Sequence, residues 1–318
     1  MSLAVEVRGV RKRYGGLAAV EDLTFAIQSG EILGVLGPNG AGKTTAIRVL
    51  TTILAPTRGT FEVAGVSHTQ PAKIRQRIGV LPESAGYPDR QTGEEYLRYH
   101  ARLYGHRTDS ARATADSLLS EVGLHDRGRS LIDTYSRGMK QRLGIARALV
   151  NSPEVVFLDE PTLGLDPAGQ RQMLALVRLI AEQRGATVLL STHLLAEVEE
   201  TCTRVLILNR GRVAAEGTVA EVSRRAAAPR SARLRVPAEL LVDALQVLSH
   251  ADGIQAAEQT DGQPGTLRLT LREEQHGVPT SAALSDLTNR GVPVLAFELE
   301  GARLSDAFLA MTEGAGDE

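Results

Sequence analysis

Gly37-Pro38-Asn39-Gly40-Ala41-Gly42-Lys43-Thr44 is the stretch that decides the fold of this chain of 318 residues. It matches the pattern G-x-x-x-x-G-K-[ST], whose glycines let the backbone wrap closely around phosphate groups. A strand-like apolar run, Glu31–Leu36, precedes this loop, and a helical stretch, Lys43–Leu54, follows it. The free N–H groups at the start of that helix attract anions. We therefore predict that residues 37–44 and Thr45 bind nucleotide phosphates, with Lys43 directed at the β- and γ-phosphates.

A pair of adjacent acids ends another apolar run, Val155–Leu158. Asp159 and Glu160 follow this run directly. We expect Asp159 and the Thr44 hydroxyl to hold Mg²⁺ from opposite sides, because this ion prefers oxygen ligands. Glu160 can act as a general base that polarises an attacking water. The phosphate loop and the two acids together predict hydrolysis of a nucleoside triphosphate.

The apolar pattern predicts an α/β fold for the first two thirds of the chain. Continuous apolar runs, which are typical of buried parallel strands, alternate there with helical stretches such as Gln170–Gln183. Residues 5–7 and 23–27 alternate instead, which indicates an antiparallel sheet with one buried face. Strand signals fade between residues 84 and 150, and we predict a helical insert there. The strand-like runs are Glu31–Leu36, Val155–Leu158, Thr187–Ser191 and Val205–Leu208, and the helical stretches of the insert are Glu94–Tyr104, Ser110–Val122 and Met139–Val150.

The C-terminal part predicts a second, small α+β domain. Its expected strands and helices follow one another in the order βαββαβ. Residues 224–231 contain Pro229 and are short in large apolar side chains, so we predict a linker between a first domain at 1–223 and a second at 232–318. The expected strands of the second domain are Ala232–Val236, Thr266–Leu271 and Val292–Leu299, and its expected helices are Ala238–Leu248 and Ser281–Arg290.

Composition excludes several classes of protein. The chain carries 36 basic and 38 acidic side chains, a net charge of −2, which excludes a strongly basic nucleic-acid binder. Residues 1–229 carry a net charge of +5 and residues 230–318 one of −7, so we expect no nucleic acid at the acidic tail. No uncharged apolar run of about 18 residues suggests a membrane span, and the N-terminal residues lack the apolar core of a signal peptide. Cys202 is the sole cysteine, which excludes a disulfide framework and fits a reducing compartment.

A third motif, Tyr135-Ser136-Arg137-Gly138-Met139, lies upstream of the acidic pair. With it, the chain resembles the nucleotide-binding subunits of ATP-binding cassette (ABC) transporters. The signature of that family is L-S-G-G-Q, with which Ser136 and Gly138 agree, whereas Tyr135, Arg137 and Met139 depart from it. In the family, this motif binds the ATP that lies on the partner subunit. The resemblance covers residues 3 to about 222 and implies a P-loop NTPase fold with an ABC ATPase core.

Further family positions can be assigned one by one. Tyr14 would stack on adenine, Asp166 in Leu163–Asp166 would act across the dimer, and His193 would contact the γ-phosphate. The family usually has a glutamine in the loop after Val80-Leu81-Pro82, where this chain has Glu83. A carboxylate can still ligate Mg²⁺, but it lacks the amide's hydrogen-bond donor. We expect Glu83 to alter how this loop responds to the γ-phosphate.

The resemblance also implies cofactors and partners. The cofactors are ATP and Mg²⁺, and two subunits close head to tail on two ATP molecules, as a homodimer or with a second ABC ATPase. Separate integral membrane permease subunits convert this motion into transport, so we expect a cytoplasmic protein bound to the inner face of the cell membrane. Glu83 with Tyr135–Met139 resembles the export branch that includes daunorubicin-resistance-like ATPases. Ser305–Thr312 resembles the closing helix of that branch's C-terminal domain, whose expected role is to reinforce the dimer.

Two other functions stay open. The tail could instead sense a small ligand in an importer ATPase, or the chain could be a soluble ABC protein of translation or DNA repair. The single phosphate loop and the lack of a heptad run in the insert count against the soluble class. Tyr96, Tyr99 and Leu103 fall on one face of a predicted helix, which either packs in the core or docks a membrane subunit. The transported substrate cannot be read from this chain, because in this family it contacts the membrane subunits.

Overall fold

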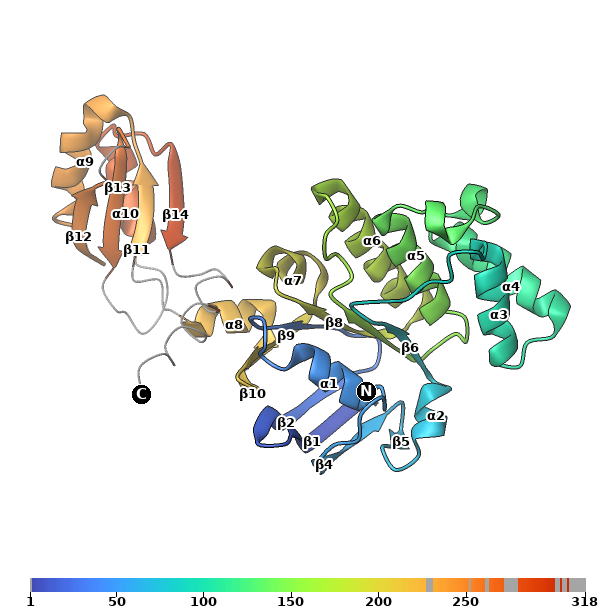
Figure 1. Ribbon diagram of the computed structural model, residues 1–318. Helices are drawn as coiled ribbons and strands as arrows, with labels where there is room; N and C mark the ends of the chain where they lie inside the picture. Colours follow the sequence, from blue (N-terminus) through green and yellow to red (C-terminus); the bar gives the residue numbers. More distant parts are fainter. Residues whose placement is uncertain are drawn as a thin grey trace. The chain divides into compact units, whose positions relative to one another are not determined.

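The structure, a computed structural model, describes residues 2–226, 231–251, 253–260, 263–271, 280–300, 304 and 308. The chain forms two compact units, Met1–Val219 and Ala220–Glu318 (Figure 1). Each unit has its own apolar core. Among the described residues, no helix has both the length and the apolar character needed to cross a bilayer.

Ten described strands of the first unit form one sheet in the order β5-β4-β1-β2-β10-β9-β3-β8-β7-β6. Strands β3, β6, β7, β8 and β9 pair in parallel at one end, and β1, β2, β4 and β5 pair antiparallel at the other. Strand β10 joins the two parts, because it pairs antiparallel with β9 and bridges to β2 at Arg212 and Asp22. The predicted parallel sheet and antiparallel part are confirmed, and they form one continuous sheet. The strands are β1 (Leu3–Tyr14), β2 (Leu17–Gln28), β3 (Ile32–Leu36), β4 (Arg58–Val63), β5 (Val66–Ser67), β6 (Ile78–Leu81), β7 (Val155–Asp159), β8 (Thr187–Thr192), β9 (Arg204–Asn209) and β10 (Arg212–Thr218).

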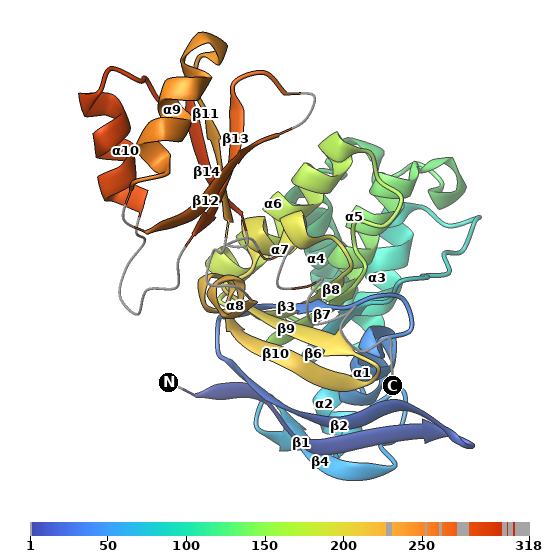
Figure 2. The ribbon, with the colours of Figure 1, turned by 90° about the vertical axis from the view of Figure 1, so that its left-hand side faces the viewer.

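Helices cover both faces of the parallel strands. Along β7, Val155 and Phe157 pack in one apolar core, and Val156 and Leu158 pack in the other, because successive side chains of a strand point to opposite faces. Helix α1 packs on the first face, between the parallel strands and β1, β2 and β4, and α5 and α6 pack on the second (Figures 1 and 2). This layering holds the loop between β3 and α1 at the edge where the parallel strands end. The helices of this core are α1 (Lys43–Leu50), α2 (Pro71–Arg75), α5 (Arg137–Ala148), α6 (Pro167–Arg184) and α7 (Leu195–Thr201).

The insert between β6 and β7 is helical, as predicted. Helix α3 (Gly93–Leu103) begins at a capping box, in which Thr92 Oγ1 accepts from the Glu95 N–H at 3.2 Å and the Glu95 carboxylate accepts from the Thr92 N–H at 2.9 Å. Helix α4 (Thr108–Glu121) follows it, and α5 begins two residues before the predicted Met139 because Ser136 caps its first turn.

The second unit contains the predicted order βαββαβ. Its four described strands form an antiparallel sheet in the order β12-β13-β11-β14, which packs against two helices. Strand β14 begins later than the predicted Val292, because Pro293 lacks the N–H group that a strand pairs. The predicted order includes β12, but the sequence pattern does not locate this strand, since its polar residues hide the alternation. The elements are β11 (Ser231–Arg235), α9 (Leu241–Leu248), β12 (Ile254–Gln259), β13 (Thr266–Leu271), α10 (Thr280–Asn289) and β14 (Ala296–Glu300).

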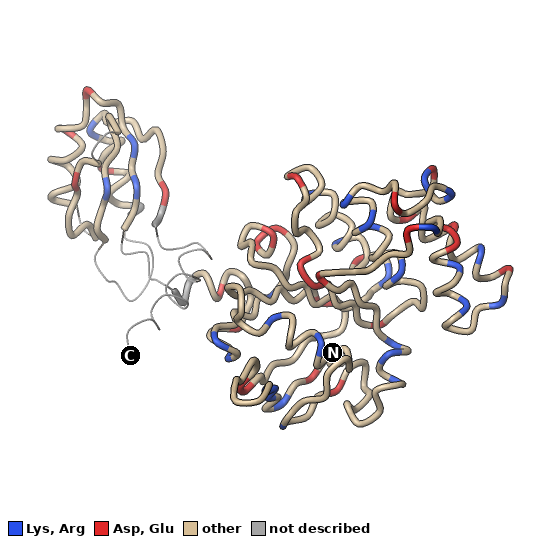
Figure 3. Tube along the Cα trace, viewed as in Figure 1, with Lys and Arg blue, Asp and Glu red and all other residues tan. Residues whose placement is uncertain are grey.

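The boundary of the two units, between Val219 and Ala220, differs from the predicted linker at 224–231. Helix α8 spans Val219–Ala226, because this run has no glycine or proline to break a helix, and Ser231 already belongs to β11. Residues 227–230, and all of the predicted closing helix Ser305–Thr312 except Phe308, lie outside the described residues. In Figure 3, basic and acidic positions of the first unit are interspersed along the trace, in keeping with the balanced charge.

Candidate functional site

The loop between β3 and α1 is shaped by Gly42. This residue precedes the first turn of α1 with φ at +103°, a left-handed conformation that favours glycine. A Cβ atom here would lie 2.4 Å from the Ala19 carbonyl oxygen in β2, so a larger residue would push the loop off the sheet. Helix α1 begins directly after Gly42, and the first N–H groups of a helix have no partner within it, so they are free to bind an anion.

Lys43 is buried in this loop, with 6% of its surface exposed. Its ammonium donates to the carbonyl oxygens of Gly37 at 2.6 Å and Pro38 at 3.4 Å, and it lies 3.5 Å from Glu160 Oε1. The long side chain therefore curls back over the loop and holds its positive charge above the start of α1. The charge is available to an anion that enters the loop.

The two acids at the end of β7 have different surroundings. Asp159 Oδ1 accepts from the Ser191 hydroxyl at 2.5 Å and from the Thr44 hydroxyl at 3.3 Å. Burial raises the pKa of Asp159, the two hydroxyl bonds partly offset this rise, and the nearby charges of Glu83 and Glu160 add to it. Glu160 has a left-handed backbone with φ at +49°, so the chain leaves the strand conformation at this residue. The side chains of Asp159 and Glu160 therefore do not follow the regular alternation of a strand.

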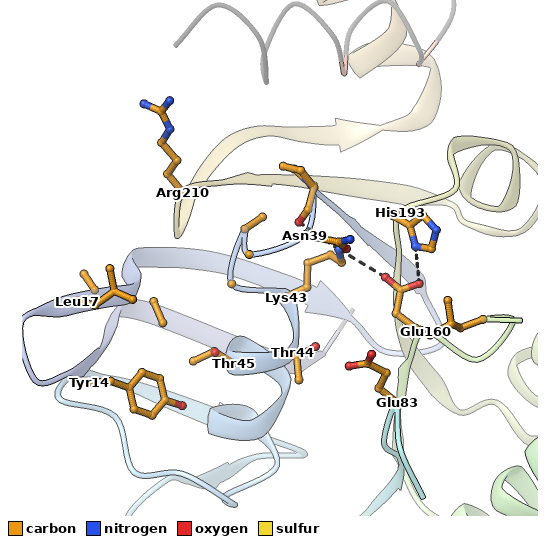
Figure 4. A pocket seen from close by; sticks show the side chains of 17 residues that line it. Tyr14, Leu17, Asn39, Lys43, Thr44, Thr45, Glu83, Glu160, His193 and Arg210 are labelled. Carbon is orange, nitrogen blue, oxygen red and sulfur yellow. Dashed lines mark hydrogen bonds and ion pairs between the residues drawn. The ribbon is translucent and has the colours of Figure 1, made fainter. Parts of the chain in front are cut away.

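Glu160 faces Lys43 and His193. Its Oε2 atom lies 2.8 Å from His193 Nδ1, and its Oε1 atom lies toward Lys43. His193 follows the last residue of β8, so the parallel pairing of β7 and β8 brings the two residues to the same sheet edge. Figure 4 shows Lys43 and His193 pointing at the Glu160 carboxylate, with Glu83 close by.

These residues line one cavity of about 790 Å³. Tyr14, at the far end of the cavity from Glu160, is 47% exposed, and Lys12 Nζ lies 5.5 Å from the centre of its ring (Figure 4). The residues that the sequence predicts for nucleotide and metal line this cavity, with the exception of Gly37 and Asp159. Gly37 directly precedes Pro38 of the lining, and Asp159 accepts a hydrogen bond from Thr44 of the lining. The lining residues are Tyr14, Leu17, Ala18, Ala19, Pro38, Asn39, Gly40, Ala41, Gly42, Lys43, Thr44, Thr45, Glu83, Glu160, Leu163, His193 and Arg210.

Arg210 is a lining residue that sequence reasoning missed. It occupies the turn between β9 and β10 with φ at +49°. The next residue, Gly211, donates its N–H to the Ala41 carbonyl in the phosphate loop at 2.9 Å and accepts from the Glu21 N–H at 2.8 Å. These two long-range bonds hold the turn at the rim of the cavity, and the sequence carries no signal for them beyond a hairpin turn at Asn209–Gly211.

The residues predicted to act across a dimer do not line this cavity. Ser136 caps α5 by accepting from the Met139 N–H at 3.3 Å, and Asp166 caps α6 by accepting from the Gly169 N–H at 3.1 Å. A Cβ atom on Gly138 would contact the Leu165 side chain at 3.7 Å, so the starts of α5 and α6 lie side by side. Ser136, Gly138 and Asp166 therefore form a second polar surface of the first unit.

The predicted aromatic face of α3 is divided. Tyr96 is buried, with its ring 5.7 Å from that of Tyr87, whereas Tyr99 and Leu103 are 56% and 64% exposed. Each of the two alternatives for this face holds for part of it: Tyr96 packs in the core next to α5, where its hydroxyl accepts from Arg147 at 3.4 Å, and Tyr99 and Leu103 stay exposed. The exposed residues line a shallow hollow together with Glu95, Arg98 and Arg102.

Comparison with known proteins agrees with this geometry. Residues 20–163 match the family described as ABC transporter. The chain is 37% identical over 317 residues to the daunorubicin/doxorubicin resistance ATP-binding protein DrrA of Streptomyces peucetius, which covers 99% of this chain and 94% of that protein. It is 30% identical over 311 residues to the linearmycin resistance ATP-binding protein LnrL of Bacillus subtilis (strain 168), with 97% and 98% covered.

A solved structure, the ATP binding subunit of an ABC transporter, is 34% identical to the chain. It superposes with a TM-score of 0.63 over 70% of this chain and 93% of that one. The phosphate loop, the acid pair and the histidine at one sheet edge are thus found in a chain whose similarity to ATP-binding subunits extends over nearly its whole length. The chain belongs to the ABC transporter family, as one of its ATP-binding and ATP-hydrolysing subunits.

Proposed function

We propose that this subunit powers the export of antibiotic-like molecules through separate membrane subunits. The observation that carries the proposal is the convergence of Lys43, Glu160 and His193 in one cavity at the end of the parallel strands. The similarity over nearly the whole chain to two drug-resistance ATP-binding proteins favours export over the importer and soluble alternatives. In the proposal, the chain works at the cytoplasmic face of the membrane.

In the proposed reaction, Glu160 is the general base. It takes the proton of the attacking water, while Lys43 and His193 turn from its carboxylate to the γ-phosphate. The N–H groups at the start of α1 bind the remaining phosphate oxygens. Loss of the γ-phosphate then removes the contacts that favour the closed state, so the dimer opens.

Magnesium fits the donors at the end of β7. Thr44 and Asp159 already share a hydrogen bond, and Glu83 lines the same cavity. Burial raises the pKa of Asp159 and the charges of Glu83 and Glu160 raise it further, so a cation bound there would stabilise its ionised form. When bound, Mg²⁺ would neutralise phosphate charge.

Tyr14 is proposed to stack on adenine. We expect Tyr14→Ala to weaken ATP binding about tenfold, because stacking on an aromatic ring contributes ~1–3 kcal/mol per base. Fluorescence titration with ATP and with adenosine measures this. Both ligands should lose affinity by a similar factor, and Tyr14→Phe should keep it. A loss confined to ATP would contradict stacking, since adenosine has no phosphates.

Dimer formation is proposed to complete the site. Ser136 and Gly138 at the start of α5, and Asp166 at the start of α6, would reach the ATP on the partner subunit. Arg137, which stands where the family signature has glycine, packs its guanidinium against Gly164 in the same subunit, so the two segments are held together. The proposal includes a homodimer or a pair with a second ABC ATPase, and it gives the C-terminal unit the role of reinforcing the dimer.

The loop that carries Glu83 is proposed to couple nucleotide to the membrane subunit. The carbonyl of Val80, before this loop, accepts from Arg147 of α5 at 2.8 Å. The hydroxyl of Tyr87, after it, donates to the Lys140 carbonyl of α5 at 2.7 Å, and the Tyr87 ring packs on Tyr96 of α3. A displacement of Glu83 would therefore move α3 and its exposed hollow.

The hollow on α3 is the proposed docking site of the membrane subunit. We expect Tyr99→Ala to weaken the association of the chain with its membrane subunit by about tenfold, since buried aromatic residues often dominate interfaces. Tyr104→Ala is the matched control, because Tyr104 is also exposed at the end of this helix but does not line the hollow. Copurification from detergent measures both. Equal recovery of Tyr99→Ala and wild type would exclude this docking site.

Direction of transport is tested in the same complex. In inside-out vesicles with ATP outside, an exporter loads doxorubicin, used as a probe, into the lumen. The nucleotide sites face the added ATP in that orientation, so accumulation should disappear without ATP or with Glu160→Gln. Absence of accumulation would exclude this drug class as substrate, and ATP-driven depletion of preloaded vesicles would favour import.

A further inference from the structure

Glu197 is a buried carboxylate that the proposed reaction does not use. It lies on α7, four residues after His193, with 4% of its surface exposed, and it does not line the nucleotide cavity. Its neighbour Val198 is fully buried, and a Cβ atom on Gly34 of β3 would lie 3.0 Å from the Val198 methyl groups, so α7 packs closely on the central sheet. Glu197 is therefore held on a helix that packs against the strands of the first unit.

The carboxylate ends a short chain of hydrogen bonds that starts from the backbone next to His193. The Leu194 N–H donates to Thr192 Oγ1 at 3.1 Å, and Thr192 Oγ1 lies 2.6 Å from Glu197 Oε2. Because the Thr192 oxygen accepts from the backbone, its single hydrogen is free to donate to the carboxylate. Both side chains are buried, so water does not compete for this bond.

Burial makes this arrangement costly. Glu197 Oε1 has no hydrogen-bond partner among the described residues, and a buried acceptor without a partner lowers the stability of the folded state. An apolar residue of similar size would avoid this cost. The carboxylate fixes the position of the Thr192 hydroxyl, and through this hydroxyl it fixes the backbone that leads into His193.

His193 depends on this backbone for its place. Its side chain is 40% exposed, so packing alone does not hold the ring against Glu160 Oε2, 2.8 Å away. Residue 192 is the last of β8, and residue 194 donates to it, so the turn that carries His193 is closed by the Thr192 hydroxyl. We propose that Glu197 is a positioning residue, which fixes this turn through Thr192 and so directs His193 at Glu160 and the γ-phosphate.

The inference rests on the proposed role of His193, and Glu197→Leu tests it. We expect turnover of ATP to fall about 10- to 30-fold, because small misplacements of catalytic groups cost up to about 100-fold. Affinity for ADP should stay within about twofold, since ADP lacks the γ-phosphate that His193 would contact. Glu197→Gln should restore most turnover, because its carbonyl oxygen accepts the same Thr192 hydrogen bond.

Matched variants separate position from folding. Thr192→Val removes the hydroxyl with little change of shape and should reproduce the loss seen with Glu197→Leu. It also keeps the test valid if Glu197→Leu fails to fold. Glu200→Gln, three residues further on the same helix, changes an exposed carboxylate paired with Arg178 and should leave turnover unchanged.

A double-mutant cycle with His193→Ala decides the mechanism. If Glu197 acts through His193, adding Glu197→Leu to His193→Ala should cause no further loss of turnover. A further loss of the same size in that background would overturn the inference. Wild-type turnover in both Glu197→Leu and Thr192→Val would also overturn it. So would a Glu197→Gln variant that is as impaired as Glu197→Leu. Wild-type turnover in His193→Ala would instead overturn the proposed function of that residue, which separates the two failures.

Discussion

Replacing Glu160 by glutamine should abolish most ATP hydrolysis while ATP still binds. Glutamine keeps the shape of the side chain and can still meet Lys43 and His193, but it cannot take a proton from water. Loss of a general base costs typically ~10²–10⁴-fold in rate, and we expect a reduction in this range. Phosphate release measures turnover, and equilibrium titration measures binding.

The same variant should accumulate as an ATP-bound dimer. Since closure is proposed to depend on the γ-phosphate, a subunit that cannot remove this group stays closed. Size-exclusion chromatography with ATP and with ADP tests this, and Glu200→Gln serves as the control, because it changes an exposed carboxylate that does not line the cavity. Turnover near the wild-type rate in Glu160→Gln would assign the base to another residue.

Lys43→Ala should remove most of the affinity for ATP. The ammonium is proposed to contact the β- and γ-phosphates, and a hydrogen bond to a charged group contributes ~1.5–3 kcal/mol, which corresponds to a loss of about 10- to 100-fold. Hydrolysis should fall further than affinity, since charge builds up on the same oxygens during the reaction. Isothermal titration with ATP and AMP measures the loss, which should be small for AMP because it lacks both phosphates.

Lys73→Ala is the matched control for this variant. Lys73 lies in α2, is exposed and does not line the cavity, so the same change of charge there should leave ATP binding intact. Equal loss in both variants would indicate a general effect of charge. Unchanged ATP affinity in Lys43→Ala would contradict the assignment of the loop.

The phosphate loop and the parallel core could be predicted because their signals are local. Gly42 and Lys43 stand at a fixed spacing in a strand, loop and helix, and the apolar runs of β3, β7 and β8 are continuous. The join through β10 could not be predicted, because it depends on the single bridge between Arg212 and Asp22 across distant parts of the chain. A pattern of apolar residues identifies strands but does not say which strands pair.

The parts of the site that escaped prediction depend on tertiary contacts. Arg210 reaches the cavity because the neighbouring Gly211 is bound to the phosphate loop. Glu197 reads as one more acid on an amphipathic helix, and only its burial beside Thr192 sets it apart. The periodicity of α3 groups Tyr96 with Tyr99, but their surroundings differ because α5 covers one of them. In each case, the sequence shows the residue type but not the residue that bonds to it or packs on it in the fold.

The bridge from Lys43 through Glu160 to His193 has a consequence for the energy balance of the cycle. Lys43 and His193 both already contact the Glu160 carboxylate, so in the proposed cycle an arriving γ-phosphate displaces Glu160 from these two side chains. When the phosphate leaves, the carboxylate can take its place again. In this cycle, Glu160 competes with the γ-phosphate for the same two side chains, and the contacts it gives up reduce the net free energy that phosphate binding gains.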